Sequence, residues 1–108
     1  MSRNPLIEKK IQQIFPNKDV SEIIECLEEY GADSKEKDRV HLAILKLCEE
    51  EKRSDPSVYV EAAKADYRDV LAWAEYPHQM KHGPEKDPKI AARLIKKDEE
   101  QYKAWLNK

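Results

Sequence analysis

Residues 58–77 read VYVEAAKADYRDVLAWAEYP, and this stretch decides the fold class. Projected as a helix, it carries apolar side chains over most of its circumference. Its solvated face is narrow and consists of Glu61, Lys64, Arg68 and Glu75. A helix with so wide an apolar arc is expected between other helices at the centre of a helical protein. Asp55 and Pro56 provide a start signal, and Pro77 is expected to end or kink the helix.

The same signals recur outward from this segment in both directions. Apolar residues at helical spacing, with Asn, Asp or Ser caps and prolines at the starts, predict four more helices. These span about Pro5–Phe15, Asp19–Tyr30, Ser34–Lys52 and Asp87–Lys108. Residues 77–87 hold three turn breakers and are expected to form one long loop. With only two glycines in 108 residues, the composition favours helix over sheet. We therefore predict an all-α fold: one compact bundle of about five helices forming a single domain over residues 1–108.

Four polar residues fall on helix faces that should be apolar. Asp66 and Asp69 lie in the apolar arc of the central segment, Asp98 in that of the last segment and His41 in that of the third. A buried carboxylate without a partner costs several kcal/mol, so each aspartate needs a donor or a proton. The pattern has two interpretations. One is a structural polar network or caps on the ends of adjacent helices, which we favour; the other is a small-ligand, metal or acid/base site.

The charges are distributed unevenly along the chain. Residues 1–18 and 81–108 each carry a net charge of +3, whereas residues 19–55 carry −6. Basic terminal helices that pack against an acidic middle explain this division within one molecule. The alternative is a basic face for nucleic acid or an acidic partner, made by Lys89, Arg93, Lys96 and Lys97. The overall charge of −2 argues against nucleic acid, because nucleic-acid-binding domains usually have a strong basic excess.

Several classes of chemistry find no support in the residues. A di-iron bundle needs two Glu-x-x-His pairs, and the single one, Glu75 to His78, contains Pro77. His78 and His82 are spaced for a zinc pair only if a helix continues through them, and no third ligand accompanies them. Isolated glycines exclude a phosphate-binding loop. We expect no catalytic residue, no metal and no cofactor.

Cysteine usage and hydropathy indicate the cellular environment. In an antiparallel hairpin, Cys26 and Cys48 would lie ~13 Å apart, so we expect two free thiols rather than a disulfide. The longest apolar run, residues 70–74, is far shorter than the ~20 residues of a membrane span. We therefore expect no membrane association, and in a reducing cytosol both cysteines would remain small hydrophobic side chains.

Three strings resemble a group of short bacterial hypothetical proteins. They are RVHLAILKL at residues 39–47, AAKADYRDVLAWAEYP at 62–77 and DEEQYKAWL at 98–106. The resemblance implies an all-helical bacterial cytoplasmic protein and assigns no catalytic residue. These strings contain all three inward-facing aspartates.

Two functions are favoured from the sequence, ahead of weak nucleic-acid binding through the basic face of the last helix. The first is a non-enzymatic helical module that binds another protein, or a second copy of itself, through an apolar or charged face. The second is a ligand or enzyme site built on Asp66, Asp69, Asp98 and His41. A cavity reached by at least two of these side chains would favour the second function, and a closed core the first.

Overall fold

The computed structural model describes residues 4–31, 36–52 and 55–108, which form six α-helices and no strand. The helices are α1 (Pro5–Ile14), α2 (Val20–Leu27), α3 (Lys37–Glu50), α4 (Ser57–Glu75), α5 (Pro77–His82) and α6 (Pro88–Leu106). The all-α prediction is confirmed. The predicted number of helices was one too low, because the expected long loop begins with α5. The predicted cap Ser34 lies outside the described residues.

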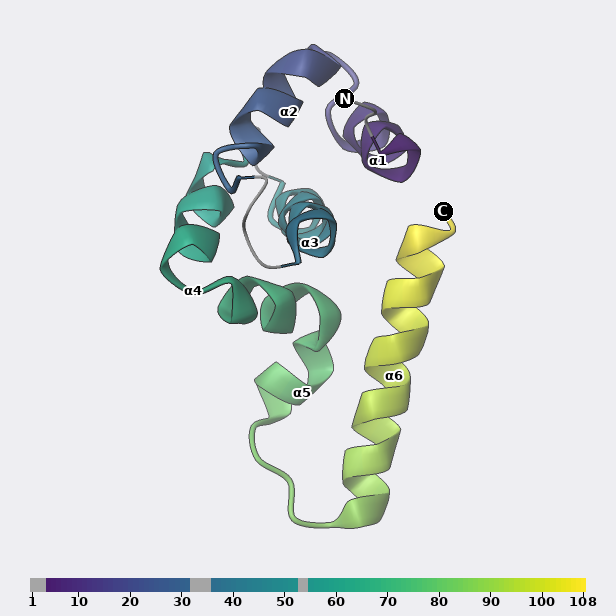
Figure 1. Cartoon of the computed structure of the whole chain (residues 1–108). Coiled ribbons are helices and arrows are strands. Elements are labelled where there is room, and N and C mark those ends of the chain that lie inside the picture. Colours follow the sequence, from purple (N-terminus) through teal and green to yellow (C-terminus); the bar gives the residue numbers. More distant parts are fainter. Residues whose placement is uncertain (1–3, 32–35, 53–54) are drawn as a thin grey trace.

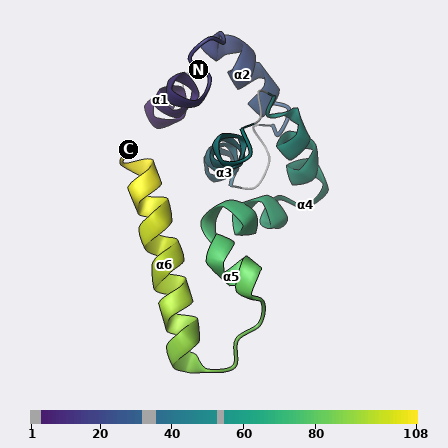
Figure 2. The same ribbon diagram turned by 180° about the vertical axis from the view of Figure 1, so that it is seen from behind.

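Helix α3 lies at the centre of the molecule (Figures 1 and 2). The most extensive packing of α3 is against α4, and α1 also packs against α3. Side chains from all three of these helices, with others from α2 and the end of α6, form the core. The fully buried apolar side chains are Ile11, Leu27, Val40, Ala43, Ile44, Leu45, Cys48, Val60, Val70 and Ala74. Helix α6 runs along one side of the molecule and packs against α5 and α4.

Local capping explains where three of the helices begin. The side chain of Asn4 accepts a hydrogen bond from the Leu6 amide (2.9 Å), and Pro5 occupies the first turn. Asp19 caps α2 in the same way, and Asp87 caps α6. Each cap satisfies an amide that has no partner within its own helix. The predicted starts of these helices are confirmed.

Helix α4 is kinked at Asp66. This residue has extended backbone angles (φ −157°, ψ 103°), and its carboxylate accepts a hydrogen bond from the Arg68 amide at 3.0 Å. Asp66 therefore caps a second helical segment that starts just after it. The Arg68 guanidinium also donates to this carboxylate, and these bonds lower the pKa of Asp66.

The kink changes which side chains of α4 face the core. A single helical projection over residues 58–77 placed Glu75 on the solvated face and Trp73 in the apolar arc. In the structure Glu75 is buried, and Trp73 is 40% exposed. Both predictions were wrong, because the extended residue at 66 rotates the second segment relative to the first.

An ion pair fastens the second segment of α4 to α3. Arg39 donates from Nε and Nη2 to the two carboxylate oxygens of Glu75, at 2.8 and 2.5 Å. This paired geometry raises the pKa of Arg39 well above its usual value. Arg39 is 43% exposed, whereas only 9% of the Glu75 side chain is exposed, so Glu75 depends on this partner.

A buried lysine links the first helix, α1, to the last helix, α6. Lys10 of α1 is fully buried, lies 4.4 Å from the centroid of the Trp105 ring and donates a hydrogen bond to the Trp105 carbonyl. It thereby supplies a cation at the C-terminal end of α6, where the helix dipole is negative. Burial lowers the pKa of Lys10. In addition, Lys108 pairs with Glu49 of α3 at 3.6 Å, the type of contact expected between a basic terminus and the acidic middle.

Two further predictions concern the thiols and the membrane. Cys26 and Cys48 form no disulfide with each other, as predicted, and burial raises the pKa of Cys26. Within the described part of the chain, none of the helices combines the length and the apolar character that crossing a bilayer requires.

Candidate functional site

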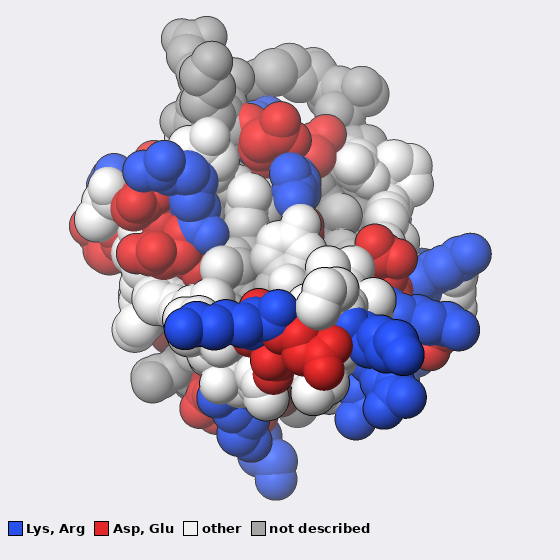
Figure 3. Space-filling model, turned by 90° about the horizontal axis from the view of Figure 1, so that it is seen from below, with Lys and Arg blue, Asp and Glu red and all other residues white. Residues whose placement is uncertain are grey.

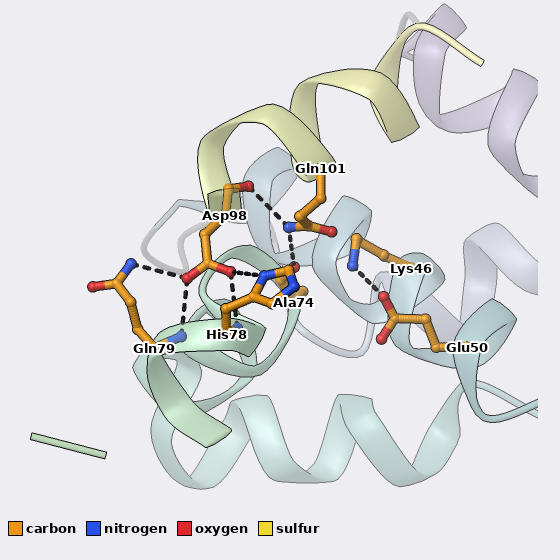
Figure 4. Close-up of polar contacts among 7 residues, drawn as sticks. All are labelled: Lys46, Glu50, Ala74, His78, Gln79, Asp98 and Gln101. Atoms are coloured by element: carbon orange, nitrogen blue, oxygen red, sulfur yellow. Dashed lines mark hydrogen bonds and ion pairs between the residues drawn. The ribbon is translucent and has the colours of Figure 1, made fainter. Parts of the chain in front are cut away.

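Of the four polar residues predicted to face inward, only Asp98 forms a cluster of hydrogen bonds with several other residues. It is fully buried on α6, and its carboxylate faces the start of α5 (Figure 4). One oxygen accepts from the amide of His78 at 2.8 Å and the other from the amide of Gln79 at 3.1 Å. Asp98 therefore caps the N-terminus of a neighbouring helix, one of the structural alternatives predicted from the sequence.

Side chains complete the shell around this carboxylate. His78 Nδ1 lies 2.7 Å from one oxygen, and Gln79 Nε2 donates to the other at 3.0 Å. Burial raises the pKa of Asp98, but hydrogen bonds from the amides and side chains of His78 and Gln79 outweigh it, so the pKa lies below its usual value. An ionised carboxylate only accepts hydrogen bonds, so His78 Nδ1 is the donor in this pair. Gln101 of α6 donates a hydrogen bond to the Ala74 carbonyl near the end of α4, at 3.5 Å, and so links α6 to α4 beside this cluster.

The lowered pKa of Asp98 makes stability dependent on pH. Because the pKa is lower in the folded than in the unfolded protein, the ionised carboxylate stabilises the fold above the unfolded value of ~3.9. We expect this stabilisation to be complete above about pH 5 and to be lost as the pH falls through the folded-state pKa. Urea unfolding measured between pH 7 and pH 3 tests this. The free energy of unfolding of the wild type should exceed that of Asp98→Asn at pH 7, and the difference should shrink as the pH falls. A difference that is constant over this range would contradict the prediction.

The sequence had predicted that Asp66 and Asp69 face neighbouring helices, but in the structure they do not. The Asp66 side chain is 37% exposed and pairs with Arg68 on its own helix, and Asp69 is exposed. The kink is again the reason, because it removes these residues from the arc assumed for one continuous helix. Neither aspartate takes part in the bonds around Asp98.

His41 is buried, as predicted, but it lies apart from Asp98. Its Nε2 donates to the Tyr30 carbonyl at 3.1 Å, and its ring meets that of Tyr30 edge-on. Burial lowers the pKa of His41, which favours the neutral imidazole in this position. His41 therefore satisfies a carbonyl just after α2 and stands apart from the Asp98 cluster.

The two histidines that have the spacing of a zinc pair have other partners. Residues 77–82 are helical, so His78 and His82 do lie one turn apart, contrary to the expected loop. However, His78 bonds to Asp98, and His82 Nε2 lies 2.6 Å from a carboxylate oxygen of Glu85. Across residues 4–31, 36–52 and 55–108, no group of three or more His, Cys, Asp or Glu side chains is arranged to hold a metal ion.

The predicted basic face lies on the exposed side of α6. Its members, Lys89, Arg93, Lys96 and Lys97, are all exposed. Viewed from below, Lys and Arg side chains gather on the side of the molecule where α6 lies (Figure 3). Lys96 is 4.0 Å from Glu100 on the same helix, and the other three have no acidic partner in the described part of the chain.

A groove that the sequence did not reveal lies between α3, α4 and α5. It has a volume of about 440 Å³ and is lined by Leu47, Glu50, Glu51, Tyr59, Trp73, Pro77, Met80 and Lys81. Leu47 and Tyr59 are buried and form its floor, whereas Trp73 and Met80 are 40% and 50% exposed. The groove forms only because the kink exposes Trp73 and because α5 carries Met80. The helical spacing from Pro77 to Met80, with proline at a first turn, was the available signal.

A second hollow, of about 540 Å³, lies between the ends of α1 and α3. Its lining comprises Gln13, Ile14, Phe15, Pro16, Asn17, Lys18, Cys48, Glu49 and Lys52. Neither hollow is lined by Asp66, Asp69, Asp98 or His41. By the criterion set from the sequence, these hollows give no support to a ligand site built on those four residues.

Comparison with known proteins adds no relative. No protein-family model, no curated protein and no solved structure matches the chain.

Proposed function

We propose that the protein is a non-enzymatic interaction module that binds an apolar, basic segment of a protein in the groove between α3, α4 and α5. The observation that carries this proposal is the exposure of Trp73 and Met80 above a buried apolar floor. Tryptophan is enriched among residues that dominate protein interfaces, and methionine adapts its shape to different partners. The bacterial origin and cytoplasmic location implied by the resemblance stay predictions.

The carboxylates on the α3 side of the groove favour a basic group on the partner, although Lys81 of α5 also lines the groove. Helix α3 ends in Glu49 and Glu50 and is followed by Glu51, at the negative end of its dipole and with no basic residue in its last turn. Glu49 pairs with Lys108, and Glu50 with the buried Lys46 (Figure 4). Glu51 is exposed and has no cationic partner in the described part of the chain. A lysine or arginine beside the apolar anchor of a partner would therefore be stabilised here.

A protein segment fits the groove better than a small molecule does. Sites for small molecules enclose most of the ligand and orient it with a few fixed polar groups. Here two of the walls are half-exposed side chains, and the polar groups Glu51 and Lys81 lie on the exposed rim. The geometry therefore supports contact with a larger surface that covers the groove.

A selection from random displayed peptides tests this function. The immobilised wild-type chain is the target, and Met80→Glu serves as the counter-target because it puts a charge in the groove. We expect enriched peptides that share an apolar anchor with a nearby basic residue and bind the wild type roughly tenfold more tightly than Met80→Glu. Val58→Glu is the matched control, since Val58 is 51% exposed and lies outside the groove. Peptides that bind all three proteins equally would contradict the proposal.

A further inference from the structure

We infer that the groove takes helix α6 of a second copy of this chain. This inference rests on the proposed function and names its partner. The chain carries both halves of a complementary contact. One is a groove with buried apolar residues, with Glu50 and Glu51 on its α3 side and Lys81 on its α5 side; the other is a helix that exposes an apolar residue among basic ones. Contact between them buries apolar surface on both sides and brings opposite charges together.

The matching surface of α6 is a short stripe. Ile90, Arg93 and Lys97 are spaced i, i+3 and i+7, so they lie on one face of the helix. Ile90 is 39% exposed, and both basic residues are exposed. Arg93 and Lys97 have no acidic partner among residues 4–31, 36–52 and 55–108, so both charges are available to a second molecule. The stripe thus has the apolar anchor and the neighbouring cations that the groove favours.

The charges at the groove match this stripe. Ile90 contacts Trp73 and Met80 in the pairing we infer, and Arg93 or Lys97 approaches Glu51. Glu51, just after the C-terminal end of α3, then gains a cationic partner. Two copies that exchange this contact, each placing its α6 in the groove of the other, form a two-fold symmetric, isologous dimer.

Sedimentation equilibrium over a dilution series tests the inference directly. We expect a mass that rises above one chain with concentration, and an association that weakens at high salt because the ion pairs are screened. Ile90→Glu should weaken association by about tenfold or more, and Met80→Glu should do the same. Ile95→Glu is the matched control, because Ile95 is 43% exposed on another side of α6. A mass of one chain at every concentration, or equal effects of Ile90→Glu and Ile95→Glu, would overturn the inference.

Mixing the two variants identifies the surfaces that meet. Met80→Glu retains an intact α6, and Ile90→Glu retains an intact groove, so their equimolar mixture should associate more tightly than either variant does alone. A contact of groove with groove would not be restored by mixing and would overturn the inference. A monomeric chain whose α6 charges bind duplex DNA in a salt-dependent way would also overturn it, and would assign this face to phosphates.

The failure of this inference can be told apart from failure of the proposed function. If the chain is monomeric but displayed peptides bind the wild type more tightly than Met80→Glu, the groove binds protein segments and its partner is another protein. If Met80→Glu changes neither peptide binding nor mass, both proposals are wrong.

Discussion

Replacement of Asp98 by alanine is expected to lower the free energy of unfolding by about 3 kcal/mol. The carboxylate accepts four hydrogen bonds, two of them from amides of α5 and two from the side chains of His78 and Gln79. Loss of a helix cap costs about 0.5–2 kcal/mol, and loss of a hydrogen bond to a charged group about 1.5–3 kcal/mol. These losses overlap, because the freed groups gain access to water as α5 loosens.

Equilibrium urea unfolding followed by circular dichroism measures this effect. Asp98→Asn should be less damaging than Asp98→Ala, because its side chain keeps one acceptor oxygen. Asp69→Asn is the matched control, since Asp69 is exposed, and its effect should lie within about 0.5 kcal/mol of the wild type. Amide hydrogen exchange gives a local readout, and protection of His78 and Gln79 should fall most in Asp98→Ala. Unchanged protection at these two amides would contradict the role of Asp98 as a cap for α5.

Replacement of Arg39 by methionine is expected to cost about 2–3 kcal/mol. Methionine retains much of the apolar stem but removes both hydrogen bonds to Glu75, which leaves a buried carboxylate without its cation. Removal of one partner of a fully buried pair costs about 3–5 kcal/mol. The expected value is smaller here, because Arg39 is 43% exposed and water replaces part of the lost interaction.

A double-mutant cycle separates this interaction from effects on packing. Glu75→Gln alone leaves an arginine that water can solvate, so its cost should be about 1 kcal/mol. The combination of Arg39→Met and Glu75→Gln should be less destabilising than the sum of the single changes by about 1 kcal/mol or more. Additive effects would mean that the ion pair does not couple α3 to the second segment of α4.

The sequence located most helices but not the faces that they present. Caps act within three residues, so Asn4, Asp19 and Asp87 marked the starts of α1, α2 and α6 correctly. The projection of residues 58–77 failed because it assumed one unbroken helix. A capping aspartate within an apolar pattern, Asp66 followed by Arg68, was the signal of a break.

The inward-facing polar residues show the same division. Burial of Asp98 and His41 followed from the apolar neighbours on their own helices, and both are buried. Their partners did not follow, since the amides of α5 and the carbonyl of Tyr30 come from other parts of the chain. Helical projection gives only the direction in which a side chain points, so it could not show that these two residues lie in separate places.

The sequence by itself determined the all-α class and the capped starts of α1, α2 and α6, because these depend on composition and on neighbours along the chain. Tertiary structure decided the existence of α5, the burial of Lys10 and Glu75 and the formation of the groove. Helix α5 has six residues, too few to be stable alone in water, and the carboxylate of Asp98 from α6 stabilises its first turn. A helix that depends on a residue twenty positions away leaves only a weak local signal in the sequence.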